Sequence, residues 1–589
     1  MYSLRMSIST IRPQEMLLKT RHKHKLFCIF SALVLSFIIA NLYFEQAYNY
    51  VSGNTENNKV TSLDKQYSSI TSGESSDLVE KLSHKFWNHT FTIMNNNGLD
   101  FNSNEIEGVI HYNDKSEQDL KTSSKDGLLS KAKISKETFK EFKQKHDSLL
   151  NELPPVISES TYKPNSSGII YVGGGKYSWL SYISLLGLRE TGSKLPVEIM
   201  LPTINDYEKE LEFCDVLLPK LNASCVVIPN SLGSSVSSFW SNKFRSYQFK
   251  SLALMTTSFQ NVLLLDSDNI VIENPDTFFE SKLFKEYGMI TWPDYWERTI
   301  SPLFYNISGV KVNERRRIRY NRLPLQVSLE DNLTEKESKE VPYHDLDGTV
   351  PDLSTESGQL FINKATHGRT LLLSLYYNIY GPNLYYKLFS LGEKGEGDKD
   401  TFAAAATVLK QTFYQLKSSI KAIGHFDSDV HFQGKAMAQK NPVVDNEIFQ
   451  DTVLNTFDNN KKALEKPLNE KITERKQIIE EYFNSNNNNP IFAMHCHYPK
   501  LDPSDLMKRK DIYDEERMQL HYRMYNNFTF KRMGQDEQID FELRQWQNMH
   551  KSLCEDNLYF EHFNNTNRKE LCEFINNQVR WLSQGTKSL

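Results

Sequence analysis

The sequence predicts an α/β fold with a mixed, mostly parallel sheet, and two kinds of observation predict it. Short apolar runs at Gly168–Val172, Val197–Leu201 and Val262–Leu265 have the length and composition of strands. Because Val262–Leu265 has no polar break, it is typical of a strand buried on both faces of a sheet. Helical spacing of apolar residues in Phe249–Phe259 places a helix before this run. The order strand, helix, strand favours parallel pairing.

The composition is that of a folded protein with little net charge. Of 589 residues, 39% are hydrophobic and 12% aromatic, enough for one large domain with appendages or for several domains. The 69 basic residues nearly balance the 74 acidic ones, for a net charge of -5. This balance gives no reason to expect a nucleic-acid partner.

An apolar segment near the N-terminus predicts a membrane anchor. Leu26–Phe44 is apolar apart from three small polar residues, and as a helix it extends roughly 28 Å, about one bilayer core. Basic residues precede it, so the positive-inside rule places residues 1–25 in the cytosol and the remainder of the chain in a lumen. A cleaved signal peptide is the alternative, but no convincing small-residue cleavage site follows.

The cysteines agree with an oxidising lumen. Cys214 lies close in sequence to Cys225, and Cys554 to Cys572. We therefore predict a disulfide within each of these two pairs, which leaves Cys496 without a predicted partner. Sequons of the form N-x-S/T are candidate glycosylation sites, although such sequons are frequent by chance in a chain rich in Asn and Ser. Their asparagines are Asn88, Asn165, Asn222, Asn306, Asn332, Asn527 and Asn564.

Residues 45–166 are predicted to form a luminal stem with a helical neck. The part up to residue 130 is rich in polar residues and buries too little to order itself fully; an irregular folded domain is the alternative. Ser130–Leu153 has spaced apolar residues and predicts the neck helix, which Pro154–Pro155 ends. We expect the main folded domain at 167–503 and a mostly helical region packed on it at 504–589.

Two aspartates, Asp266 and Asp268, follow the apolar run in Asn261–Ile270. Ligands of open α/β sheets bind just beyond the carboxyl ends of strands. Two carboxylates at such a place suit Mg²⁺ or Mn²⁺ together with substrate phosphates. The alternative is a polar loop that only ends a strand, because Asp, Ser and Asn are common turn formers.

A second polar cluster lies in Ile491–Pro503, where a predicted strand runs into His495, His497 and Lys500. A neutral imidazole can complete a metal shell begun by carboxylates, and a lysine can neutralise a diphosphate. Structural or surface roles are the alternative for both histidines.

The glycine loop Gly173–Gly174–Gly175–Lys176 follows the first predicted strand. Glycines there let the backbone approach a ligand closely, and the lysine can meet a phosphate. We expect Gly173, Gly174 and Lys176 to contact a ligand, although the spacing fits neither the dinucleotide fingerprint nor the Walker pattern.

Clustered aromatic and charged residues at Pro293–Arg298 suit a sugar, because sugar rings need flat apolar faces and hydrogen-bonding edges. Asp294, Trp296 and Arg298 are the candidates, and core filling is the alternative. The basic run Arg315–Arg322 is predicted to be a solvated loop or a contact for an anionic acceptor or a membrane surface.

Three more stretches complete the prediction. Glu356–Lys364 places a polar cluster ahead of a short strand. Gly395–Phe402 is acidic and opens a helix, for which Asp398 or Asp400 is a candidate N-cap. Residues 324–350 are expected to be a loop.

Taken in order, six blocks of this chain resemble the fungal Golgi α-mannosyltransferases that branch the outer mannan chain, the α-1,2-mannosyltransferase family. The resemblance implies a GT-A-type nucleotide-sugar fold for the catalytic domain 167–503. It implies GDP-mannose as donor, Mn²⁺ as cofactor, an oligomannose acceptor on glycoproteins, and a single-pass type II protein of the Golgi membrane. The blocks are KFRSYQFKSLAL, NVLLLDSDNI, TWPDYWERTISP, ESGQLFINK, GEGDKDTF and HCHYPKLDP.

The resemblance also implies roles for particular residues. Asp266 and Asp268 would hold Mn²⁺ and the donor diphosphate, with either His495 or His497 as a further metal ligand. Lys500 would contact a phosphate. Lys250, in the first block, is expected beside the donor.

An α-linked donor that gives an α-linked product means retention of configuration. A covalent intermediate would require a carboxylate beneath the anomeric carbon, and Glu356, Asp398 and Asp400 are the candidates. A same-face mechanism requires none, and the choice stays open, as does that between α-1,2 and α-1,3 transfer.

Two rival hypotheses fit parts of the pattern. An aspartyl-phosphate phosphotransferase also places two aspartates after an apolar strand and would use Asp266 as nucleophile, but that motif normally continues with Thr or Gly rather than Asn269. A Golgi lectin or scaffold without catalytic activity would need the aromatic block but no metal and phosphate site.

Overall fold

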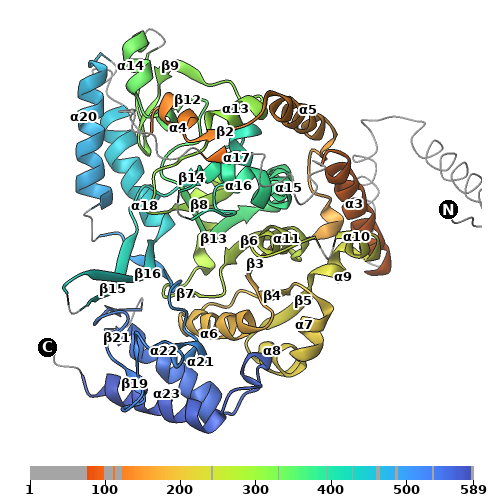
Figure 1. The fold of residues 1–589 in the computed structure, drawn as a ribbon, viewed down its shortest axis with the longest axis vertical. Coiled ribbons are helices and arrows are strands. Elements are labelled where there is room, and N and C mark those ends of the chain that lie inside the picture. The colour runs from red at the N-terminus through yellow and green to blue at the C-terminus, as the bar shows by residue number, and fades with distance from the viewer. Residues whose placement is uncertain are drawn as a thin grey trace, which may run out of the picture. The chain divides into compact units, whose positions relative to one another are not determined.

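The computed structural model describes most of the chain after the predicted anchor (Figure 1). The predicted cytosolic tail, the membrane segment 26–44 and the beginning of the stem lie outside the described residues. Within the described part, no helix combines the length and the apolar character that crossing a membrane requires. The described residues are 76–98, 111–112, 123–240, 243–328, 331–393, 395–427, 429–458, 465–484, 488–532 and 536–585.

A seven-stranded sheet forms the centre, in the order β14-β8-β13-β6-β3-β4-β5. β3, β4, β5 and β6 pair in parallel, as do β8 and β14, while β13 runs antiparallel between β6 and β8. The predicted mixed, mostly parallel sheet is therefore confirmed. Its strands are β3 Lys163–Val172, β4 Val197–Leu201, β5 Ala223–Val227, β6 Phe259–Leu265, β8 Met289–Pro293, β13 Thr355–Asn363 and β14 Tyr414–Gln415.

Both faces of this sheet are buried, which explains the unbroken apolar runs. Successive residues of a strand point to opposite faces, and in β6 Leu263 and Leu265 enter one core while Val262 and Leu264 enter the other. Helix α6 (Lys176–Glu190) covers the first face. Helices α11 (Gln248–Thr256), α15 (Lys364–Ile379) and α17 (Thr401–Val408) cover the second.

A second, antiparallel sheet begins where the first one ends. Its order is β15-β16-β17-β7, and β7 starts four residues after the end of β6. The chain therefore crosses from one sheet to the other through Asp266–Asp268. Its strands are β7 Asn269–Val271, β15 Lys421–Phe426, β16 Phe432–Lys440 and β17 Ile491–His495.

Part of the predicted stem packs against the core instead of standing apart from it. Helix α3 (Ser76–Asn96) buries Trp87 and Phe91, and α5 (Lys136–Glu152) buries Phe142, all in the core beneath α11 and α15. Composition did not reveal this because a few apolar residues on one face suffice to dock an otherwise polar helix. The neck helix begins at Lys136, six residues after its predicted start.

The C-terminal region packs on α6 and is drawn in blue below that helix in Figure 1. The Trp179 ring of α6 lies 5.3 Å from that of Phe560 and 5.1 Å from that of Phe563. Besides the predicted helices, the region contains two short strand pairs. Its elements are α21 Pro503–Leu506, β18 Tyr513–Asp514, β19 Gln519–Leu520, β20 Thr529–Phe530, β21 Ile539–Asp540, α22 Phe541–Met549 and α23 Arg568–Ser583.

The basic run forms strands rather than the predicted loop. These are β9 (Asn313–Arg317) and β10 (Arg319–Tyr320), and the Arg317 guanidinium lies 2.6 Å from Asp345. Arg319 donates to the backbone carbonyls of His344 and Thr349. Arg315 is exposed, whereas Arg317 and Arg319 fasten a neighbouring segment and are not free to meet a membrane or an anionic acceptor. The neighbouring segment, expected to be a loop, contains the helix α14 (Glu335–Glu340) and the strand β12 (Leu346–Asp347).

The remaining elements connect these layers. They are β1 His111–Tyr112, α4 Lys125–Ser130, β2 Ala132–Lys133, α7 Ile204–Lys209, α8 Leu218–Lys220, α9 Ile228–Leu232, α10 Ser234–Trp240, α12 Lys282–Tyr287, α13 Pro302–Ile307, β9 Asn313–Arg317, β10 Arg319–Tyr320, β11 Leu323–Pro324, α14 Glu335–Glu340, β12 Leu346–Asp347, α16 Tyr386–Ser390, α18 Pro442–Phe449 and α20 Leu468–Ile478.

Cys214 forms a disulfide with Cys225, and Cys554 with Cys572, which are the predicted pairs. Cys496 is buried and forms no disulfide with any cysteine that the structure describes.

Candidate active site

Three side chains that can ligate a metal meet at the junction of the two sheets. Asp266, Asp268 and His495 each offer one ligand atom, and these atoms lie within 4.8 Å of one another. The Nε2 atom of His495 is 3.4 Å from Asp268 Oδ1 and 3.8 Å from Asp266 Oδ2. Strand register brings them together, because β17 pairs with β7 so that His495 lies opposite Asn269.

The geometry separates the two candidate histidines. His495 is 8% exposed, ends β17 and faces both aspartates. His497 is exposed beyond the strand, and its Nδ1 lies 3.4 Å from the backbone carbonyl of His495. His495 is therefore the histidine placed to complete the carboxylate pair.

Glu356 orients the His495 ring from behind. Its Oε1 atom lies 2.9 Å from His495 Nδ1, which leaves Nε2 facing the aspartates. Gln439 donates to the other carboxylate oxygen at 3.2 Å, and the amide of Gly358 donates to Oε1 at 2.5 Å. Ligating histidines in proteins usually have such a partner on the other ring nitrogen. The predicted nucleophile candidate Glu356 thus has both oxygens engaged.

Gly358 makes this approach possible, and sequence reasoning did not single it out. A Cβ atom there would lie 2.2 Å from Glu356 Oε1 and 2.6 Å from His495 Nδ1. Any side chain would force these two groups apart. Gly358 lies just ahead of the strand predicted from the sequence, but the observed β13 includes it, and a glycine inside a strand often marks a close approach.

Two lysines lie against the aspartates. Lys250, on α11, places Nζ 2.8 Å from Asp266 and 3.8 Å from Asp398, and it donates to the Ser357 carbonyl at 3.1 Å. Lys500 pairs with Asp268. Both lysines therefore lie where the sequence analysis expected the donor.

Charges shift the protonation of the cluster. Burial alone would raise the pKa of Asp268, but His495 and Lys500 hold it well below its ordinary value. Burial alone would lower the pKa of His495, but Asp268 and Glu356 raise it well above the usual range. Burial raises the pKa of Asp266. A cation at this position would replace the Nε2 proton of the imidazole.

These residues fit a divalent cation. Carboxylate oxygens and imidazole nitrogen are the donors that Mg²⁺ and Mn²⁺ accept. The ring is held by a buried carboxylate, so the ligand set is oriented in advance.

Asp398 and Asp400 both precede α17. Asp398 faces the metal-ligand cluster, whereas Asp400 pairs with Arg298. The Oδ1 atom of Asp398 accepts from Ser357 Oγ at 3.1 Å, and burial raises the pKa of Asp398 to about 6 against the opposing charge of Lys250. Asp400 lies 2.6 Å from Arg298 and accepts from the Thr355 amide at 2.9 Å. Its carboxylate therefore joins Arg298 to the start of β13, and a role for Asp400 in the chemistry stays a prediction.

The predicted acceptor block divides in the same way. The Arg298 side chain is 0% exposed and donates to the carbonyls of Pro351 and Leu353, so its charge is satisfied inside the fold. A contact between Arg298 and an acceptor stays a prediction. Trp296 is 46% exposed, and Asp294 pairs with Lys399 at 2.7 Å. Trp296 therefore remains available at the surface of the site, whereas Asp294 is buried in an ion pair.

The glycine loop joins β3 to α6, as predicted. Gly174 and Gly175 have φ angles of 96° and 54°, which favour glycine. A Cβ on Gly173 would lie 2.6 Å from Ile199, so this glycine serves packing, whereas Gly175 faces open space. Lys176 is half-buried at the start of α6.

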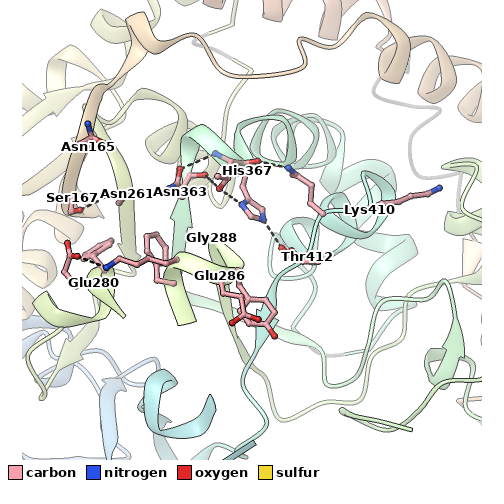
Figure 2. Close-up of a pocket in the computed structure, with 16 residues that line it drawn as sticks. Asn165, Ser167, Asn261, Glu280, Glu286, Gly288, Asn363, His367, Lys410 and Thr412 are labelled. Carbon is pink, nitrogen blue, oxygen red and sulfur yellow. Dashed lines mark hydrogen bonds and ion pairs between the residues drawn. The ribbon is translucent and has the colours of Figure 1, made fainter. Parts of the chain in front are cut away.

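A cavity of about 610 Å³ lies at the other end of the sheet (Figure 2). It is lined by Asn261 near the start of β6 and Asn363 at the end of the antiparallel β13. Asp266 follows the opposite end of β6, roughly 17 Å away along the strand. This cavity is separate from the metal-ligand cluster.

All sequon asparagines are exposed. Their glycosylation stays a prediction. The exposed residues are Asn88, Asn165, Asn222, Asn306, Asn332, Asn527 and Asn564.

Comparison with known proteins gives consistent matches. The model of Mannosyl_trans3, a mannosyltransferase family, matches residues 166–441. Alpha-1,2-mannosyltransferase MNN23 of Candida albicans is 50% identical over 516 residues, covering 85% of this chain and 84% of the relative. Alpha-1,2-mannosyltransferase MNN2 of Saccharomyces cerevisiae is 34% identical over 488 residues, covering 80% and 78%. Among solved structures, the glycosyltransferase GlyE of Streptococcus pneumoniae is 14% identical, with a TM-score of 0.24 and coverage of 52% and 53%; so low a score carries no argument.

Proposed function

Because this chain belongs to the fungal α-1,2-mannosyltransferase family, we propose that it transfers mannose from GDP-mannose to an oligomannose acceptor and forms an α-1,2 linkage. The observation that carries the proposal is the cluster of Asp266, Asp268 and His495 at the carboxyl end of β6. Membership of this family favours the transferase over both rival hypotheses, the phosphotransferase and the lectin. A GT-A-type fold for residues 167–503 is part of the proposal, and the mixed sheet with its second antiparallel sheet supports it.

The three clustered side chains would hold Mn²⁺ against the donor diphosphate. When bound, the cation supplies Lewis-acid stabilisation of the charge that develops on the leaving nucleotide. Lys500 and Lys250 lie on either side of the aspartates and add positive charge at the same place. Glu356 keeps the His495 ring turned so that Nε2 faces the aspartates.

Asp398 is the carboxylate best placed to act on the mannosyl group in a retaining reaction. Glu356 and Asp400 are engaged by several hydrogen bonds each, whereas Asp398 Oδ2 accepts none from the residues that the structure describes. It lies 3.8 Å from Lys250, beside the proposed diphosphate position. Its carboxylate can stabilise the positive charge that develops on the sugar ring.

The proposal includes a location in the Golgi membrane. Residues 26–44 would anchor the chain as a type II protein, with residues 1–25 in the cytosol and a glycosylated catalytic domain in the lumen. The two disulfides support an oxidising compartment. Exposure of every sequon asparagine is compatible with glycosylation there.

A donor and linkage assay tests the proposed reaction. Full-length enzyme is given an α-1,6-mannan oligosaccharide with GDP-mannose, UDP-glucose or UDP-galactose, and the product linkage is read by NMR. We expect transfer from GDP-mannose and an α-1,2 linkage. Transfer from a uridine donor in preference, or an α-1,3 product, would contradict the proposal.

A further inference from the structure

A second cavity lies between the N-terminal segment and the aromatic block. Its volume is about 180 Å³, which suits a single sugar ring. Residues far apart in sequence line it, and we call it the neck pocket. Its lining includes Ser123, Leu128, Lys131, Trp296, Ser390 and Lys399.

The neck pocket lies beside the proposed reaction centre. Lys399, one of its lining residues, follows Asp398 directly in the chain and pairs with Asp294 at 2.7 Å. Ser354, another lining residue, lies two residues before Glu356, and Asp400 lines the pocket two residues after Asp398. The pocket is thus connected to the residues that surround His495.

The chemistry of the neck pocket suits a neutral polyol better than an anion. Trp296 offers a half-exposed aromatic face at its edge. Each lining cation is paired with a carboxylate: Lys399 with Asp294 at 2.7 Å, Lys131 with Glu393 at 2.8 Å and Arg298 with Asp400 at 2.6 Å. An aromatic plane flanked by paired charges provides stacking and many hydrogen-bonding atoms, as sugar hydroxyls require.

The N-terminal wall of the neck pocket is fastened to the fold. The Ser123 carbonyl accepts from the Tyr343 amide at 2.8 Å, and Lys125 pairs with Glu314 at 2.6 Å. Leu128 lies in the chain between these contacts and the Lys131–Glu393 ion pair, and its side chain is 1% exposed. The segment 123–131 therefore has a defined place against the catalytic domain.

We propose that the neck pocket binds a mannose unit of the acceptor, and that the segment 123–131, assigned by sequence to the stem, forms one wall of this acceptor site. The proposal rests on the proposed function for the identity of the sugar. It adds a binding site for the acceptor chain and gives the neck a role in recognition besides that of a spacer.

The test measures binding of an α-1,6-linked mannotetraose to the full-length enzyme by calorimetry, with GDP binding measured separately. Trp296→Ala removes the aromatic face, and Ser123→Trp fills the pocket from the N-terminal wall. Matched controls are Phe432→Ala, which alters a ring of similar exposure (45%) on another surface, and Ser235→Trp, at an exposed serine of α10. Thermal unfolding checks that each variant is folded.

We expect Trp296→Ala to weaken mannotetraose binding about tenfold, the effect of losing one stacked ring, and Ser123→Trp to weaken it at least as much by occupying the pocket, with GDP binding unchanged in both. The controls should bind both ligands like the wild type. Unchanged mannotetraose binding by folded Trp296→Ala enzyme would overturn the proposal, as would an equal loss of GDP binding. Because the readout is binding, a wild type that binds mannotetraose but transfers no mannose would refute the proposed function and leave the pocket proposal standing.

Discussion

At the scale of single residues, the charge and orientation of each candidate metal ligand depend on the residue that it pairs with. Asp268 is held between His495 and Lys500, and His495 between Asp268 and Glu356. Removing one member changes the charge and the orientation of its neighbours, so conservative substitutions are informative here.

Glu356→Gln tests the orienting role of the carboxylate. The amide has the same shape but loses the charge that holds the Nδ1–H of His495, so we expect the apparent affinity for Mn²⁺ to fall about 10–100-fold. The measurement is mannose transfer as a function of Mn²⁺ concentration. Glu280→Gln, at an exposed glutamate, is the control. An unchanged Mn²⁺ dependence would show that Glu356 does not act through the histidine.

Gly358→Ala tests the close approach of the two strands at the site. The new Cβ would overlap Glu356 and His495, so we expect loss of transfer from a protein that still folds. Gly434→Ala is a matched control, because its Cβ would meet its nearest atom at 3.7 Å. Wild-type activity in Gly358→Ala enzyme would mean that the contact is not required.

At the scale of elements, α15 begins with a lysine buried beneath the sheet. Lys364 is 0% exposed and donates to the carbonyls of Met255 and Thr257. Burial lowers its pKa to about 7. A neutral amine still donates two hydrogen bonds, so the fold can accept Lys364 without its charge.

This burial predicts a dependence of stability on pH. Because the folded pKa is about 7 and the usual value is 10.5, the unfolded chain binds more protons between these values. The free energy of unfolding should therefore rise with pH across that interval. Lys364→Met should flatten the rise, while Lys163→Met, at an exposed lysine, should retain it. Urea unfolding at pH 7 to 10 measures this, and equal slopes for wild type and Lys364→Met would refute it.

Helix α3 is expected to contribute to the stability of the catalytic domain. Trp87 is 1% exposed in the core beneath α11 and α15, so Trp87→Ala should lower the free energy of unfolding by about 3–5 kcal/mol. Leu78→Ala, at a residue that is 39% exposed on the same helix, should have little effect. Equal unfolding curves for both variants would mean that α3 does not belong to the cooperative unit.

At the scale of the whole molecule, most elements of the central sheet could be predicted because strands buried on both faces leave unbroken apolar runs. The strand predicted at Val197–Leu201 is found with the same bounds. The docking of α3 could not be predicted. Its few apolar residues indicate a buried face only once the surface that they pack against is known.

Site residues whose position follows from a local sequence pattern were predicted. Those whose position depends on contacts between distant parts of the chain were not. Asp266, Asp268 and Lys500 follow strand ends and could be expected at one edge. The choice of His495 over His497 depends on the register of β17 against β7, and the burial of Arg298 depends on loops distant in sequence. Neither register nor such pairing is visible in one sequence.

The central claim is that Asp266, Asp268 and His495 hold a divalent cation required for mannose transfer, and a Mn²⁺ titration tests it most directly. Full-length enzyme freed of metal is titrated with Mn²⁺ while free Mn²⁺ is followed by EPR, and transfer from GDP-mannose is measured on the same samples. Asp268→Asn is compared with Asp429→Asn, at an exposed aspartate of another loop. The account predicts one bound Mn²⁺ per chain in wild type and Asp429→Asn enzyme, with loss of both binding and transfer in Asp268→Asn. Wild-type Mn²⁺ binding by Asp268→Asn enzyme, or full transfer by wild type in the presence of chelator, would contradict it.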